Sequence, residues 1–336
     1  MQAFEYATPT KKEQIAVLLG DDGSVLAGGT DLLALIKDDI VTPKRLVNIK
    51  QIDGLRGVSY QPNSGLRIGA LTTVAELSDN ATVRQNYLVV TESAIEAASP
   101  QIRNLATIGG NMCQRPRCWY FRNGMGLLAT TKDGKSMMVD GDNRYGAILG
   151  NDGPAYFVSP STIAPVLIAY GAKIRIYSAK ASGTGVRELP LEKFFVIPKA
   201  EGQREHDLKP DEIVMEIIVP PPPKDLKASS YEVRQRAAFD WPLSMASVAL
   251  EMDGNTVRSA RVVLGHVAPV PWISEEAATA LVGKPVNNDT AMAAANAAVA
   301  KAKPLSRNKY KITLTKAAVK RAVLNAAAGR AGGGVA

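Results

Sequence analysis

The chain contains little cysteine and little histidine. Its 336 residues include 2 cysteines, Cys113 and Cys118, and 2 histidines, His206 and His266. So few cysteines exclude a disulfide framework. A zinc site of the Cys/His type cannot be filled from the cysteine-containing stretch alone. No run of about 20 apolar residues is present, which predicts that the chain has no membrane span.

The N-terminus lacks the basic and then apolar pattern of a signal peptide. By its own sequence the chain is therefore expected in the cytoplasm, and in the periplasm only if it is exported together with a partner. The formal net charge is +8, with both signs spread along the sequence. Because no basic and aromatic recognition motif is present, no nucleic-acid partner is predicted. The length favours two or three domains over a single core.

Two short glycine turns, roughly 80 residues apart, are the most informative feature of the sequence. We interpret each as closing an apolar strand, with Gly28-Gly29 in residues 25–33 and Gly109-Gly110 in residues 106–112. Glycine permits a close backbone approach, and successive backbone N–H groups form an anion-binding concavity. The pair predicts a site for a long ligand with a central pyrophosphate, such as a dinucleotide. Neither turn matches the Rossmann or nucleoside-triphosphatase signature.

The periodicity of the apolar residues, followed along the chain, predicts three structural parts. Residues 1–55 read as a small α/β unit with a crossover, with helices at 11–19 and 31–37 and strands at 24–27 and 45–49. Residues 56–224 contain a capping box from Thr73 to Glu76. This second part also predicts a helix at 88–98 and strands at 66–71, 172–177 and 212–219. The proline run 220–223 is the expected linker.

The third part, residues 225–330, predicts strands followed by helices. The expected strands are 231–236, 245–252 and 257–264, with a hairpin turn at 253–255. The expected helices are 274–281, 289–301 and 314–328. The alanine-rich stretch 291–302 is interpreted as a packing helix. The tail, residues 331–336, is expected to be disordered.

With these motifs in order, the chain resembles the flavoprotein subunits of the molybdenum hydroxylases. That family includes the FAD subunits of xanthine dehydrogenase, carbon monoxide dehydrogenase and aldehyde oxidoreductases. The resemblance spans essentially the whole chain and is carried by the segments that start at Leu26 (LAGGTDLL), Thr107 (TIGGN), Ser159 (SPSTIAPVL), Leu189 (LPLEKFF), Asp211 (DEIVMEIIVP) and Leu264 (LGHVAPVPW).

The resemblance implies an α+β fold of the PCMH or carbon monoxide dehydrogenase flavoprotein type. A two-subdomain FAD-binding domain is followed by a smaller α+β C-terminal domain. FAD is the implied cofactor, and Asp31 is expected to point away from its pyrophosphate and cap the next helix. No residue is implied as a general acid or base. The implied cofactor-binding residues are Leu26, Ala27, Gly28, Gly29, Thr30, Asp31, Leu32, Thr107, Gly110, Asn111, Gln114, Arg117, Thr162 and Val214.

The sequence departs from this family at three places. Residues 112–157 resemble an insertion that holds a [4Fe–4S] cluster on four cysteines in the aldehyde oxidoreductase branch. Only two cysteines remain here, so no [4Fe–4S] cluster is predicted in this chain, and the insertion is expected to be a structured loop over the flavin. Thr162 stands where the family carries an acid. Glu232 stands where relatives often carry a lysine near the flavin, which leaves Arg234 or Arg236 to supply a positive charge.

The implied function is electron relay. A molybdopterin-binding large subunit would hydroxylate an aldehyde or N-heterocycle. Electrons would pass through [2Fe–2S] clusters of a small subunit to FAD on this chain and then to an external acceptor. Two alternatives stay open: a free-standing FAD oxidoreductase of the same superfamily, and a non-catalytic docking subunit that has lost FAD. The match of the C-terminal segment counts against the first alternative, and the intact glycine turns count against the second.

Overall fold

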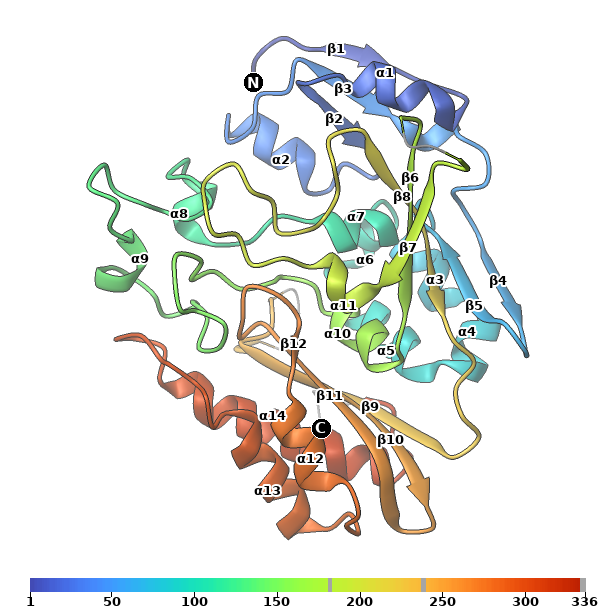
Figure 1. Cartoon of the computed structure of the whole chain (residues 1–336), viewed down its shortest axis with the longest axis vertical. Coiled ribbons are helices and arrows are strands. Elements are labelled where there is room, and N and C mark those ends of the chain that lie inside the picture. The colour runs from blue at the N-terminus through green and yellow to red at the C-terminus, as the bar shows by residue number, and fades with distance from the viewer. Residues whose placement is uncertain (181–182, 237–239, 333–336) are drawn as a thin grey trace.

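A computed structural model describes residues 1–180, 183–236 and 240–332. Three sheets follow one another along the long axis of the molecule, and each carries its own helices (Figure 1). Residues 333–336 of the expected disordered tail lie outside the described residues. The division of the chain after residues 55 and 224 stays a prediction.

The first part is a three-stranded parallel sheet in the order β1-β3-β2. In its register Val25 of β2 lies beside Val47 of β3, so the predicted crossover is confirmed. Ile15, Leu19 and Val47 are buried together beneath the sheet. Its elements are β1 (Glu5–Ala7), a 3-10 helix (Lys12–Gln14), α1 (Ile15–Leu19), β2 (Gly23–Leu26), α2 (Leu32–Lys37), β3 (Arg45–Asn48) and a second 3-10 helix (Ile49–Gln51).

The second part is a five-stranded antiparallel sheet in the order β4-β5-β8-β6-β7. The capping box is confirmed, because the Thr73 hydroxyl accepts from the Glu76 N–H and the Glu76 carboxylate accepts from the Thr73 N–H. The elements are β4 (Val58–Gln61), β5 (Gly65–Gly69), α3 (Val74–Asp79), α4 (Ala81–Asn86), α5 (Leu88–Glu96), α6 (Pro100–Arg103), α7 (Ile108–Cys113), α10 (Ile163–Ala169), β6 (Lys173–Ser178), β7 (Val186–Pro190), α11 (Leu191–Phe194) and β8 (Glu212–Val219).

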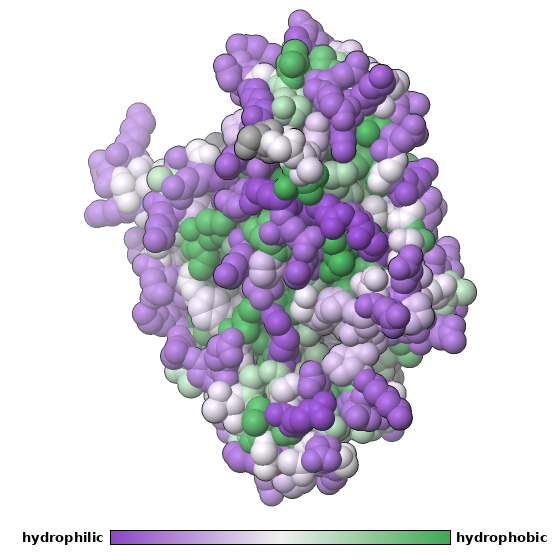
Figure 2. Space-filling model, turned by 45° about the vertical axis from the view of Figure 1, so that its right-hand side comes forward, coloured by the Kyte–Doolittle hydropathy of each residue, from purple (hydrophilic) through white to green (hydrophobic). Residues whose placement is uncertain are grey.

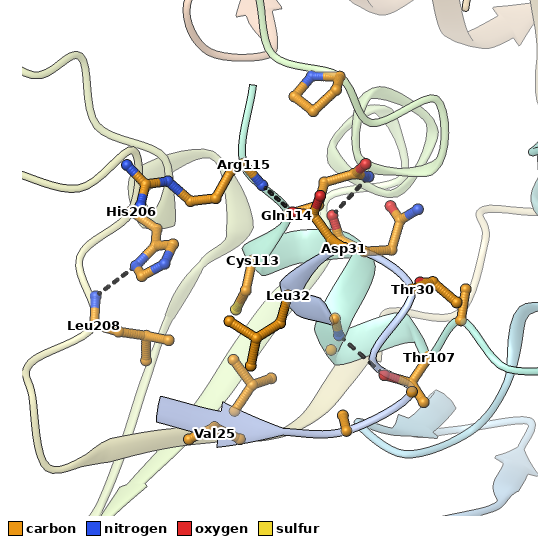
Figure 3. Close-up of a pocket in the computed structure, with 18 of the residues that line it drawn as sticks. Val25, Thr30, Asp31, Leu32, Thr107, Cys113, Gln114, Arg115, His206 and Leu208 are labelled. Atoms are coloured by element: carbon orange, nitrogen blue, oxygen red, sulfur yellow. Dashed lines mark hydrogen bonds between the residues drawn. The ribbon is translucent and has the colours of Figure 1, made fainter. Parts of the chain in front are cut away.

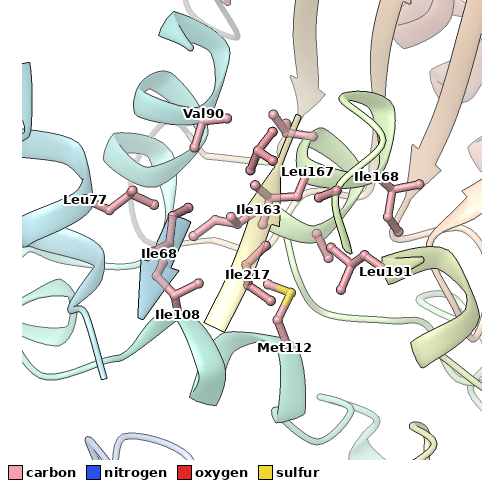
Figure 4. Close-up of a cluster of buried hydrophobic side chains, with 14 of the residues drawn as sticks. Ile68, Leu77, Val90, Ile108, Met112, Ile163, Leu167, Ile168, Leu191 and Ile217 are labelled. Carbon is pink, nitrogen blue, oxygen red and sulfur yellow. The ribbon is translucent and has the colours of Figure 1, made fainter. Parts of the chain in front are cut away.

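One core joins this sheet to its helices. Figure 4 shows Ile68 and Ile217 from the sheet facing Val90, Ile163 and Leu167 from the helices. Helix α10 is buried along its whole length, because it lies between α5 and the strands of the third part. The third part is therefore packed directly on the second.

The third part is a four-stranded antiparallel sheet in the order β12-β11-β10-β9. Helices α12 and α14 pack on this sheet, and α13 packs against both of them. The predicted hairpin joins β10 to β11. The alanine-rich helix α13 buries Ala291, Ala294, Ala295 and Ala298, which confirms its role in packing. The elements are β9 (Leu226–Val233), β10 (Ser244–Asp253), β11 (Thr256–Gly265), β12 (Trp272–Ile273), α12 (Glu275–Leu281), α13 (Asn288–Ala298) and α14 (Tyr310–Ala327).

The expected insertion, residues 112–157, extends from the side of the molecule and carries α8 (Trp119–Arg122) and α9 (Met137–Asp140) (Figure 1). Phe121, Leu127 and Phe157 of this segment are buried against Leu35 of α2. Hydrophilic residues cover much of the face in Figure 2, with apolar groups between them. In the described part of the chain no helix is long and apolar enough to cross a membrane.

Candidate functional site

A cavity of about 1140 Å³ lies where the first and second parts meet, and Arg234 and residues 240–242, which follow β9, complete its wall. This volume suits a ligand larger than most small molecules. Its wall includes nearly every residue expected to bind the cofactor: Ala27, Gly28, Gly29, Thr30, Asp31, Leu32, Thr107, Gly110, Asn111, Gln114, Arg117, Thr162 and Val214. Leu26 is the exception, because its side chain is buried with Ile36 and Leu46. Direct contact of the lining residues with FAD stays a prediction.

The first glycine turn presents unused backbone donors to this cavity. Within the described residues, none of the N–H groups of residues 28–32 donates a hydrogen bond to the protein. A Cβ on Gly28 would lie 1.8 Å from the Leu105 carbonyl oxygen, and Gly29 has φ +76°. Both positions therefore require glycine. A row of N–H groups without protein acceptors suits the oxygens of a bound pyrophosphate.

The second glycine turn is built differently from the first, and two sequence-based predictions for it are wrong. Gly109 and Gly110 do not close a strand but lie in the first turn of α7, which Thr107 caps. Their N–H groups are already used, because Gly109 donates to Ala70 O at 2.9 Å and Gly110 donates to Thr107 Oγ1 at 3.2 Å. A Cβ on Gly109 would lie 2.8 Å from the Ala70 Cβ. This glycine therefore serves the packing of α7 on β5.

Side chains, rather than N–H groups, face the cavity from this second segment (Figure 3). The Asn111 Oδ1 accepts from Ser161 Oγ at 2.6 Å, which fixes the Asn111 amide. Gln114 donates to Asn111 O at 3.0 Å. Thr162 is buried and lines the cavity beside them. These groups add polar side chains to the cavity wall.

Asp31 does not cap α2, so that prediction is wrong. Its carboxylate instead accepts from Arg117 at 2.6 Å, from Arg122 at 2.7 Å and from the Arg115 N–H at 2.8 Å. Two guanidiniums from the insertion draw the carboxylate away from the helix end. Asp31 therefore ties the insertion to the first turn, and two guanidinium groups offset its negative charge.

The segment 196–210 supplies a wall that sequence patterns did not indicate. Arg115 donates to Glu205 at 2.7 Å, whereas the Arg204 side chain lies 3.5 Å from Glu205 and is 44% exposed, toward the cavity that it lines. Burial lowers the pKa of His206 to about 3, and the charges of Arg204 and Arg115 add to this effect. His206 is therefore neutral, and its Nδ1 accepts from the Leu208 N–H at 3.3 Å.

The third part contributes Arg234, which follows β9, and Trp241 to the wall of the cavity. Of the two arginines considered from the sequence, Arg234 lines the cavity. The Arg117 guanidinium lies 5.1 Å from the Trp241 ring centroid, within the range of a cation–π contact. Burial raises the pKa of Glu232 to about 7, although its partner Arg234 opposes this shift.

Comparison with known proteins agrees with this geometry. Residues 2–222 match the family described as FAD binding domain in molybdopterin dehydrogenase. The chain belongs to this family. Residues 229–326 match the CO dehydrogenase flavoprotein C-terminal domain, so the order of the two domains is that of the flavoprotein subunits of molybdenum hydroxylases.

The relatives cover almost the full chain. The aldehyde oxidoreductase FAD-binding subunit PaoB of Escherichia coli K12 is 30% identical over 94% of this chain and 96% of its own length. The carbon monoxide dehydrogenase medium chain of Hydrogenophaga pseudoflava is 29% identical over 96% of each chain. A solved structure of carbon monoxide dehydrogenase from that organism superimposes with a TM-score of 0.76 at 28% identity, covering 98% of this chain and 99% of the other. The expected α+β flavoprotein fold and the oxidoreductase class are confirmed.

Both cysteines are free thiols. Cys113 lines the cavity, and burial raises its pKa to about 12. The Cys118 sulfur lies 3.6 Å from the Met138 sulfur. In the described ranges no group of three or more His, Cys, Asp or Glu side chains is placed to hold a metal ion. The absence of a [4Fe–4S] cluster stays a prediction from the cysteine count.

Proposed function

We propose that this chain binds FAD in the cavity and relays electrons within a molybdenum hydroxylase complex. The observation that carries the proposal is the first turn, whose residues 28–32 line the cavity and whose N–H groups have no acceptor within the described residues. Because each N–H group can donate to a phosphate oxygen, the turn fits the pyrophosphate of a dinucleotide. The residues present therefore fit the cofactor that the family binds.

Bound FAD would supply the electron-transfer chemistry, and the protein would supply binding, orientation and electrostatic tuning. The turn at residues 28–32 would hold the pyrophosphate. Asn111, Gln114 and Thr162 would offer polar contacts elsewhere on the cavity wall, and Val214 an apolar one. No side chain needs to move a proton for this role, which agrees with a neutral His206 and an un-ionised Cys113 at pH 7.

The proposed partners are a molybdopterin-binding large subunit and a small subunit with [2Fe–2S] clusters. The large subunit would oxidise an aldehyde or an N-heterocycle, and an external acceptor would remove the electrons from the flavin. Relatives with these activities support the proposal, since one is named for aldehyde oxidoreductase and others for carbon monoxide and xanthine dehydrogenases. The cytoplasmic location stays a prediction from the sequence.

The direct test is an absorption spectrum of the purified full chain before and after dithionite, with iron measured on the same sample. A flavin spectrum that bleaches, with no iron, is expected. Flavin together with about four irons per chain would contradict the prediction of no cluster. A colourless chain that also fails to bind added FAD would refute the relay and favour a docking subunit.

A further inference from the structure

The turn between α5 and α6 forms one wall of the cavity and has an uncommon backbone. Residues 96–99 of this turn line the cavity. Ala98 has φ +50°, a left-handed conformation that residues other than glycine, asparagine and aspartate adopt rarely. Strained backbone of this kind persists only where the surroundings hold it. The conformation of this turn therefore depends on the residues that contact it.

Two guanidiniums hold the turn by its carbonyl groups. Arg103 donates to Ala97 O at 3.1 Å and to Ala98 O at 3.0 Å. Arg234 donates to Glu96 O at 2.8 Å. Three successive carbonyls are thus bound from two directions. Arg103 belongs to the next helix of the FAD-binding domain, whereas Arg234 comes from the C-terminal domain.

The Arg234 side chain is itself fixed by a buried carboxylate. Its Nε donates to Glu232 at 2.8 Å, and its Nη2 also contacts the same carboxylate. The two side chains are 10% and 7% exposed. The Glu96 carboxylate lies 3.4 Å from the same guanidinium. Because β9 packs against α5, this network joins the two domains at the cavity wall.

We propose that Arg234 is a positioning residue for bound FAD, because it holds the strained turn 96–99 in place as a wall of the cavity. This proposal rests on the proposed function of the cavity. It assigns the C-terminal domain a role in the cofactor site through the shape of the wall. A contact of Arg234 with the flavin is not required. Removing the guanidinium should let the turn relax and loosen the ligand.

The test compares FAD binding by variants of the full chain. The apoprotein of each variant is titrated with FAD, and flavin fluorescence gives Kd. The visible absorption and circular dichroism of the bound flavin give its environment. Arg234→Met should raise Kd at least about tenfold and shift the flavin bands. Arg103→Met frees the other two carbonyls of the turn and should change the same bands in the same direction.

A matched control separates this effect from general loss of charge or stability. Arg258 pairs with Glu251 on the same sheet but is 56% exposed and far along β11 from the cavity wall residues. Arg258→Met should leave Kd and the flavin bands unchanged. If Arg234→Met does not fold, Arg234→Lys keeps the charge with fewer donors, and it should show a smaller rise in Kd with the same spectral shift.

Two outcomes refute different claims. If the wild-type apoprotein binds no FAD, the proposed function fails and this inference fails with it. If the wild type binds FAD but Arg234→Met, or the lysine variant in its place, binds with the wild-type Kd and bands, only the inference is overturned. A rise in Kd with unchanged bands would also overturn it, because mere destabilisation produces that pattern.

Discussion

A single methyl group at Gly28 should abolish tight FAD binding. An alanine Cβ there would lie 1.8 Å from the Leu105 carbonyl oxygen, whereas real Cβ atoms keep at least 3.0 Å from such atoms. The turn would have to move by about 1.2 Å, and its neighbour is backbone that cannot rotate away. A hydrogen bond near 2.9 Å that stretches by this amount is lost.

The expected magnitude follows from the number of donors that move. Hydrogen bonds to a charged group are worth roughly 1.5–3 kcal/mol each. If two of the N–H groups of residues 28–32 leave the pyrophosphate, binding weakens by about 3–6 kcal/mol. Kd should therefore rise by about 10² to 10⁴-fold. The same change at Gly110 should have a smaller effect, because its N–H is bound by Thr107 and an added Cβ would meet only the Thr107 hydroxyl, at 3.0 Å.

The assay is fluorescence titration of apoprotein with FAD, with thermal melting as the check on folding. Gly28→Ala should melt as a folded chain and still fail to hold flavin through gel filtration. Gly110→Ala should retain flavin. The reasoning is refuted if folded Gly28→Ala binds FAD within tenfold of the wild type. It is also refuted if Gly110→Ala is the weaker binder of the two.

Three further predictions concern other parts of the site and fold. Asp31→Asn keeps one oxygen acceptor but removes the negative charge that pairs with Arg117 and Arg122, so it should lower the free energy of unfolding, measured by urea denaturation, by about 2 kcal/mol. An unchanged urea midpoint would contradict the role of Asp31. Native Cys113, with its pKa raised to about 12, should react with a disulfide reagent at pH 8 about a thousandfold slower than a free thiol, and fast labelling would contradict the raised pKa. The pKa of Glu232 is raised from 4.5 to about 7, so between these pH values the folded chain binds more protons than the unfolded chain. The free energy of unfolding should therefore fall as the pH rises from 5 to 7, and Glu232→Gln should flatten this slope in urea denaturation.

Local patterns predicted the elements well because their causes are local. The hydroxyl of Thr73 and the carboxylate of Glu76 are three residues apart and form their capping box whatever surrounds them. The alanine spacing of α13 likewise defines one buried face. The turn at Gly28 and Gly29 could be predicted from the sequence because a tight turn there requires glycine.

The wrong predictions for Asp31 and Gly109, and the missed cavity residues, have causes that lie far away in the sequence. Asp31 would have capped α2, but arginines 86 and 91 positions away compete for its carboxylate. Gly109 looked like part of a second phosphate turn, but Ala70 takes its N–H. Arg204 and His206 lie in a segment with little regular structure, so no period marked them as cavity residues. Only the tertiary fold brings these groups together.

The insertion, residues 112–157, is held against the rest of the protein by hydrogen bonds, although it contains only two cysteines. Its later half is tied to the C-terminal domain by buried side chains. Asn308 donates to Gly146 O at 3.2 Å and to Ala147 O at 3.1 Å. The buried Lys311 ammonium donates to Tyr145 O at 3.1 Å, Gly146 O at 3.2 Å and His266 O at 2.8 Å.

Three carbonyls match the three N–H groups of one ammonium, so Lys311 satisfies backbone groups that burial would otherwise leave without donors. These bonds need neither a metal nor a disulfide. They explain how the insertion can remain docked beside the cavity although the cysteines for a cluster are missing. Asp31 fixes the early part of the insertion, and the C-terminal domain, which also supplies Arg234 to the cavity wall, fixes its later half. The C-terminal domain therefore contacts the chain at two separate places, the later half of the insertion through Asn308 and Lys311 and the turn 96–99 of the cavity wall through Arg234.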